Sequence, residues 1–171
     1  MERALKRLWS HPTLSGCYLV NDVEPNEQKK LSINDIKLSR RSIYGIAKLP
    51  NGKQVACATH PVIYDFECSF FNFSIPFGSL CEKYKIGKYP FHDDLPLDWQ
   101  KPIDDWLYDL SEYTFKKVKF HFGAIGFIDC ENLDEIADSD IPEKRYYALL
   151  KKNNRRLKVY HPTIYSYPFE I

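Results

Sequence analysis

The stretch that decides the fold, residues 64–77, reads YDFECSFFNFSIPF. It places six aromatic rings within fourteen positions, at Tyr64, Phe66, Phe70, Phe71, Phe73 and Phe77. Aromatic and β-branched side chains suit a pleated, half-buried surface better than a helix, so the stretch predicts a β-strand. We expect this strand to form the spine of the hydrophobic core.

The chain has the length and composition of one soluble globular domain. Its 171 residues are 44% hydrophobic and 27% charged, and aromatic residues make up 15%. Domains cluster at roughly 100 to 150 residues, so we expect a single domain over residues 1–171. The formal net charge of +1 gives no global field for nucleic acid or a membrane surface, so any such attraction would come from a local patch.

The five cysteines predict reduced thiols in a cytoplasmic protein. Their number is odd, no C-x-x-C pair occurs, and a chain of this size folds without disulfides. The first residues lack the apolar segment of a signal peptide, and no stretch is long and apolar enough to span a bilayer. We therefore expect a cytoplasmic location and no membrane contact.

On the N-terminal side of the aromatic stretch, the sequence predicts a helix over residues 1–9, a strand over residues 16–20 and a β-hairpin. The hairpin strands, residues 43–49 and 54–59, flank Asn51-Gly52. This dipeptide best tolerates the two positive φ angles of a type I′ turn. Pro61 is expected to break or bend the chain before the aromatic strand, which would extend the hairpin into a meander.

On the C-terminal side, an amphipathic helix is expected to begin near Pro102. Ile103 and Trp106 lie on its apolar face, and Asp104 and Asp105 on its polar face. The elements expected after it are a strand, a helix and one or two closing strands, over residues 118–128, 140–150 and 157–167. Strands in consecutive blocks with late helices predict an α+β domain, with a mostly antiparallel sheet and helices packed on one face. A doubly wound sheet is the weaker alternative.

Charge is segregated near the C-terminus. Every charged residue between 129 and 143 is acidic, and every one between 144 and 158 is basic. The acidic candidates for partner binding are Asp129, Glu131, Asp134, Glu135, Asp138 and Asp140. The alternative basic patch consists of Lys151, Lys152, Arg155, Arg156 and Lys158. The two runs either complement the dipole of the expected helix over residues 140–150, or form a binding surface for a basic partner or for phosphates.

Metal and catalytic sites are weakly indicated. Cys57 and His60 have the spacing of half a metal site, but residues three apart on a strand point to opposite faces, so we expect no metal there. His121 with Cys130 or Asp129 is the candidate pair for an enzyme, against the simpler interpretation of a solvated strand histidine. No catalytic residue is assigned, and no nucleotide-binding glycine motif or other cofactor signature is found.

Three histidines precede proline, which favours an extended conformation at the residue before it. They are predicted to mark strand ends or turns with easily exposed rings, at positions His11, His60 and His161.

Residues 70–76 leading to Leu80, together with residues 102–107, resemble the small cytoplasmic immunity proteins that bacteria keep against secreted toxins. The resemblance carries over no functional residue. It implies a protein that binds another protein, such as a basic toxin domain, and masks its site. We therefore expect an immunity-type protein-binding inhibitor. The alternatives are a small-molecule-binding domain or enzyme that uses His121, and a nucleic-acid binder that uses residues 144–158.

Overall fold

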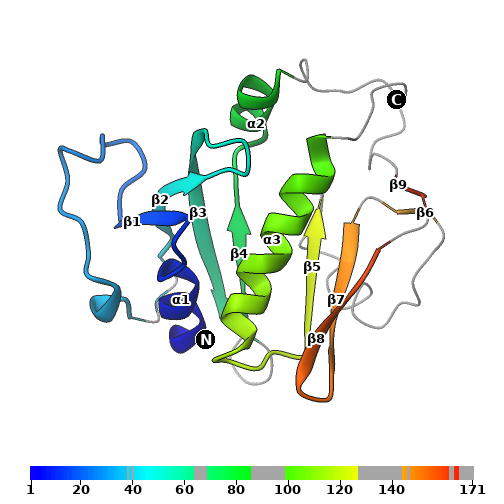
Figure 1. Cartoon of the computed structure of the whole chain (residues 1–171). Coiled ribbons are helices and arrows are strands. Elements are labelled where there is room, and N and C mark those ends of the chain that lie inside the picture. Colours follow the sequence, from blue (N-terminus) through cyan, green and yellow to red (C-terminus); the bar gives the residue numbers. More distant parts are fainter. Residues whose placement is uncertain are drawn as a thin grey trace. The chain divides into compact units, whose positions relative to one another are not determined.

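The computed structural model describes residues 1–37, 39, 41–63, 69–85, 99–126, 144–145, 147–161 and 164–165. These residues belong to two compact units, Met1–Tyr89 and Pro90–Ile171, and each unit has its own antiparallel sheet (Figure 1). The predicted α+β class with mostly antiparallel pairing is confirmed. The prediction of one domain over residues 1–171 stays a prediction.

The first unit contains a four-stranded meander with the strand order β1-β2-β3-β4. Its elements are α1 (Glu2–Trp9), β1 (Leu14–Tyr18), the 3₁₀ helix η1 (Ile33–Asp35), β2 (Ile43–Lys48), β3 (Gln54–Ile63), β4 (Ser69–Ser74) and α2 (Phe77–Tyr84). The N-terminal helix, the hairpin and the meander are confirmed. The first strand begins at Leu14, two residues earlier than expected, and ends before the exposed side chains of Leu19 and Val20.

The hairpin turn is not of type I′. The N–H of Gly52 donates to the carbonyl of Leu49 at 2.9 Å, and the N–H of Leu49 donates to the carbonyl of Lys53 at 2.8 Å. Gly52 has φ 81°, whereas Asn51 keeps a negative φ. The loop therefore has three residues, because Pro50 lacks the N–H that a two-residue loop would need at that position.

Strand β3 runs through Pro61, so the predicted break before the aromatic strand is wrong, while a bend there stays a prediction. Pro61 pairs with Phe71 of β4, whereas the pairing between β3 and β2 ends at Thr59. Proline has no N–H to donate to an adjacent strand, so it is tolerated where a strand has no neighbour on one side. Within the described residues, Pro61 has β4 beside it on one side and no paired strand on the other.

The core of the first unit forms where α1 packs on the sheet. The indole N–H of Trp9 donates to Thr59 Oγ1 at 3.1 Å, and both side chains are buried. Gly45 of β2 makes room for this ring, since a Cβ there would lie 2.5 Å from Trp9 Cζ3. Phe71 and the other described rings of β4 are only half-buried. The expected core spine is therefore wrong for the described part of the aromatic stretch.

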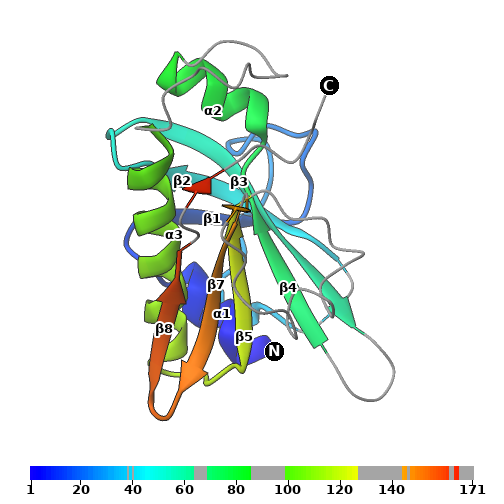
Figure 2. The ribbon, with the colours of Figure 1, turned by 90° about the vertical axis from the view of Figure 1, so that its right-hand side faces the viewer.

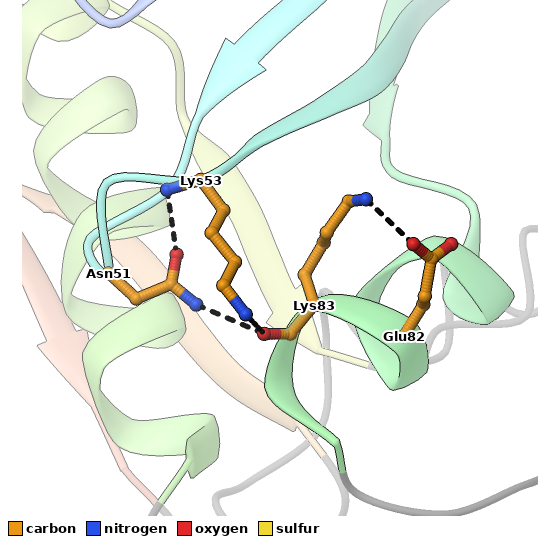
Figure 3. A network of polar contacts seen from close by, with 4 residues as sticks. All are labelled: Asn51, Lys53, Glu82 and Lys83. Atoms are coloured by element: carbon orange, nitrogen blue, oxygen red, sulfur yellow. Dashed lines mark hydrogen bonds and ion pairs between the residues drawn. The ribbon is translucent and has the colours of Figure 1, made fainter.

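Polar side chains of the hairpin loop hold the C-terminal end of α2 (Figure 3). Lys53 Nζ donates to the carbonyl of Lys83 at 2.7 Å, and Asn51 Nδ2 donates to the same carbonyl at 3.5 Å. The helix ends at Tyr84, and the next residue, Lys85, has a left-handed φ of 57°. The carbonyls at a helix C-terminus lack intrahelical partners and carry partial negative charge, so an ammonium group stabilises this end.

The second unit combines one long helix with a three-stranded sheet of order β5-β7-β8 and a short parallel pair, β6-β9. Its elements are α3 (Gln100–Phe115), β5 (Phe122–Gly126), β6 (Lys144–Arg145), β7 (Tyr147–Asn153), β8 (Arg156–Tyr160) and β9 (Ile164–Tyr165). The amphipathic helix is confirmed, with Ile103, Trp106 and Leu110 buried. Asp104 is also buried, 5% exposed, so its assignment to the polar face is wrong.

The last predicted helix, over residues 140–150, is wrong. Its described C-terminal part belongs to β7, where Leu149 and Leu150 point to opposite faces and enter two different hydrophobic clusters. A short apolar run that is buried on both faces does not alternate between apolar and polar residues, so it cannot be told from a buried helix by its sequence pattern.

The strand expected from residue 118 begins only at Phe122. The end of α3 continues as a turn, because the N–H of Val118 donates to the carbonyl of Thr114 at 3.0 Å. The closing strands over residues 157–167 are confirmed in part, by β8 and β9.

Candidate functional site

The predicted basic patch lies on the hairpin formed by β7 and β8. Lys151 pairs with Lys158 across the two strands, and Asn153 pairs with Arg156. The two-residue loop Asn154-Arg155 closes the hairpin, and Asn154 has a φ of 54°, which asparagine tolerates better than most residues. The charge run is thus folded back on itself, which brings its members together at one end of the sheet.

The side chains of the hairpin end face solvent. Lys152, Arg155, Arg156 and Lys158 are exposed, and Lys151 is half-buried. The dipole explanation for this run is wrong in its described part, because residues 147–153 form a strand, and strands carry only small net dipoles.

Apolar contacts fix the hairpin against α3. Leu150 and Leu157 form a buried cluster with Phe115 and Ile125. In addition, the hydroxyl of Tyr108 in α3 donates to the carbonyl of Leu157 at 3.3 Å. Burial raises the pKa of Tyr108, with a smaller contribution in the same direction from the charge of Glu112. The phenol therefore stays a neutral donor at physiological pH.

A second group of cations joins the hairpin from the segment that follows α3. Lys119 Nζ donates to the backbone carbonyl of Arg155 at 3.4 Å and lies 4.1 Å from the ring centre of Phe115. Lys116 and Lys117 precede it and are exposed. Figures 1 and 2 both show the end of α3, the start of β5 and the β7–β8 loop at the same end of this unit.

We call this region the basic end. It comprises eight basic residues from two separate segments of the sequence: Lys116, Lys117, Lys119, Lys151, Lys152, Arg155, Arg156 and Lys158. Glu112 lies beside them and pairs with Lys116 at 3.1 Å. The arrangement produces a local positive field in a chain whose net charge is only +1.

Aromatic rings lie next to the basic end on the face of the sheet opposite α3. Phe122 and Tyr160 pack with Ala124 against Leu149, and both rings are half-buried. Lys158 Nζ lies 4.6 Å from the ring centre of Tyr160, a cation–π distance. This face therefore combines partly exposed rings with ammonium groups.

The acidic candidates lie outside the described residues, so the structure does not place Asp129, Glu131, Asp134, Glu135, Asp138 or Asp140. Cys130 also lies outside them. His121 is exposed and directly precedes β5, and its carbonyl accepts the N–H of Lys152 at 3.1 Å. His121 thus lies beside the basic end, while its proposed pairing with Cys130 or Asp129 stays a prediction.

The half metal site at Cys57 and His60 is not assembled. The two residues lie on opposite faces of β3, which continues as one strand through Pro61. His60 Nδ1 lies 2.7 Å from Ser42 Oγ, and burial raises the pKa of Cys57 to about 12, helped by Cys17. Within the described ranges, no three residues of metal-binding type come together.

The prediction of exposed rings before proline holds for one of the three histidines. His161 is exposed, His60 is half-buried within β3, and His11 is buried. The ring of His11 folds back on Thr13, whose Oγ1 lies 2.8 Å from Nδ1.

Sequence reasoning missed the contribution of Lys116, Lys117 and Lys119 to the basic end. Their charges are visible in the sequence, but their proximity to the hairpin depends on the strand order β5-β7-β8. A covarying pair between residues near 119 and 155 would be the signal that reveals it.

Comparisons with known protein families, with curated proteins and with solved structures gave no match. None of the helices in the described ranges has the length and apolar character needed to cross a membrane.

Proposed function

We propose that the chain is a nucleic-acid-binding module that contacts phosphates through its basic end. The observation that carries the proposal is the convergence of eight cations from α3's C-terminal end and the β7–β8 hairpin. Phosphate contacts by Lys and Arg supply most of the affinity in sequence-independent nucleic-acid binding.

The geometry supports a binding surface more than a structural role for these cations. Lys151 and Lys158 occupy directly opposed positions on adjacent strands, and Lys152, Arg155 and Arg156 at the same hairpin end are exposed. Side chains that face solvent are accessible to a polyanion.

The test is a binding titration with a labelled oligonucleotide at several salt concentrations, followed by fluorescence anisotropy. Lys152→Gln/Arg155→Gln should weaken binding about 25- to 60-fold at about 0.1 M salt, because each lost phosphate contact removes about 0.7 to 0.9 from the slope of log K against log salt. The backbone carbonyl that accepts from Lys119 is unchanged in this variant.

Lys29→Gln/Lys30→Gln is the matched control, because it removes the same charge at exposed positions of the first unit. It should bind as the wild type does. If both variants lose affinity equally, net charge rather than the basic end governs binding. If the wild type binds no nucleic acid at any salt concentration, the proposal is wrong.

The charge segregation of the sequence supports a second proposal, an immunity-type inhibitor that binds a basic protein through the acidic residues between 129 and 140. Charged surfaces steer association and fix its register. Asp134→Lys/Glu135→Lys should then slow association with a partner recovered from the native host and reduce its salt dependence. A recovered partner that binds this variant unchanged would rule the acidic surface out.

A further inference from the structure

We propose that the nucleic acid bound is single-stranded and that its bases stack on Tyr160 and Phe122. This inference rests on the proposed function, and it adds the strandedness of the ligand and the residues that contact its bases. The relevant surface is the face of the β5-β7-β8 sheet opposite α3, which we call the Tyr160 face.

Strand register defines the Tyr160 face. Residues that pair across adjacent antiparallel strands point to the same side of the sheet, and side chains alternate along each strand. Phe122 pairs with Lys151, and Lys151 pairs with Lys158, so these three lie in one row across the sheet. The next row contains Ala124, Leu149 and Tyr160. The hydrophobic clusters agree, since Leu150 and Leu157 pack on the α3 side.

Each of the two rings on this face has a lysine as a neighbour. Phe122 is next to Lys151 across the strands, and Tyr160 is two residues from Lys158 along β8, with the ammonium 4.6 Å from the ring centre. Both rings are half-buried, so part of each is accessible, and both pack against the fully buried Leu149 on the same face. Proteins that bind single strands combine such stacking platforms with cations that follow the phosphates.

The Lys158 ammonium can control whether a base reaches the ring of Tyr160. It lies over the ring of Tyr160, and a phosphate would draw it away because a charge-assisted hydrogen bond is stronger than an exposed cation–π contact. Its departure uncovers the ring for a base. The same lysine thus contacts phosphate and controls access to the stacking surface.

The hairpin is poorly suited to a duplex. The major groove of a duplex is about 12 Å wide and admits a two-stranded ribbon, so a further segment beside the ribbon makes it too wide to enter. Here the segment before β5 lies along one edge, because the N–H of Lys152 donates to the carbonyl of His121 and Lys119 Nζ donates to the carbonyl of Arg155. The two rings also need unstacked bases, which a duplex does not offer.

The experiment compares a labelled pyrimidine-rich single strand with a duplex of the same length in anisotropy titrations at matched salt. The single strand should bind at least about tenfold more tightly. Tyr160→Leu should weaken single-strand binding about 5- to 100-fold, the range for loss of one stacked base, with an unchanged salt slope. Tyr160→Phe keeps the ring and should bind as the wild type does. Lys158→Gln should instead reduce the salt slope by about 0.7.

Photocrosslinking gives a readout that does not depend on a variant that folds. A 5-iodouridine oligonucleotide bound to the wild-type protein should crosslink to Tyr160 or Phe122, identified by mass spectrometry of the digested complex. Equal affinity for duplex and single strand, or crosslinks confined to other residues, would overturn the inference.

The inference and the proposed function fail in different ways. If Lys152→Gln/Arg155→Gln loses affinity while Tyr160→Leu binds as the wild type does, the phosphate-binding function holds and the stacking inference is wrong. If neither single strand nor duplex binds, both are wrong.

Discussion

Replacing Gly45 by alanine should destabilise the first unit, because the position lies directly under the ring of Trp9. The added methyl group would lie 2.4 Å from the carbonyl oxygen of Ser15, and 2.5 Å and 2.7 Å from Trp9 Cζ3 and Cη2. Favourable contacts between carbon atoms lie near 3.5 to 4.0 Å. The indole or the strand must therefore move.

The expected loss of unfolding free energy follows from these contacts. Overpacking a tight site costs about 1 to 3 kcal/mol, and a displaced indole also loses its buried hydrogen bond to Thr59, worth about 1 kcal/mol. Gly45→Ala should thus cost about 2 to 4 kcal/mol in urea unfolding followed by circular dichroism.

Gly78→Ala is the matched control, since a Cβ at that position of α2 meets no atom within 4 Å. It should be neutral or stabilising by up to about 1 kcal/mol, as glycine is a poor helix former. In a Trp9→Leu background, Gly45→Ala should cost at least about 1 kcal/mol less than in the wild type. A Gly45→Ala variant as stable as Gly78→Ala would refute the reasoning.

The remaining predictions concern the core, the polar contacts and the thiols. Trp106→Ala should cost about 3 to 5 kcal/mol in chemical denaturation, and a loss below about 1 kcal/mol would contradict its burial. Lys53→Met should speed hydrogen exchange in α2 but not in α3, because it removes the bond to the last turn of α2; unchanged α2 protection would contradict this. Burial raises the pKa of Cys17 to about 11 and of Cys57 to about 12, so neither thiol should react with a disulfide reagent near neutral pH until denaturant is added. The stability that the two neutral thiols contribute should be complete below their ordinary pKa of 9.0 and should fall as pH rises toward 11 and 12, which alkaline denaturation at fixed urea would measure.

The sequence predicts best the elements whose signals are local. The helix that contains Ile103 and Trp106 has a clear period, and Asn51-Gly52 marks the hairpin even though its turn type is different. Leu149 and Leu150 fail as signals because they are buried on opposite faces of the sheet, and this burial depends on tertiary packing. Asp104 fails for a related reason, since its burial depends on what packs around α3 rather than on its own helix.

The candidate site could be found only in part from sequence. The cations between Lys151 and Lys158 are adjacent in the chain, so the run itself suggests a surface. Lys119 is more than thirty residues away from Arg155, and it joins the site because β5 pairs with β7 and places residue 121 beside Lys152. Strand pairing over such separations depends on the packed sheet, which local propensity does not encode.

The position of Pro61 has a consequence for self-association. Among the described residues, strand β3 extends four residues, 60–63, beyond its last pair with β2 and has no strand beside it on that edge. An unpaired strand edge offers N–H and C=O groups on which a second chain can add, and segments rich in rings are prone to assemble in this way. Pro61 removes one donor from the middle of this overhang and fixes its φ, so an incoming strand cannot complete a regular ladder there. The proline therefore allows β3 to support the aromatic strand β4 while guarding its other edge against fibril growth.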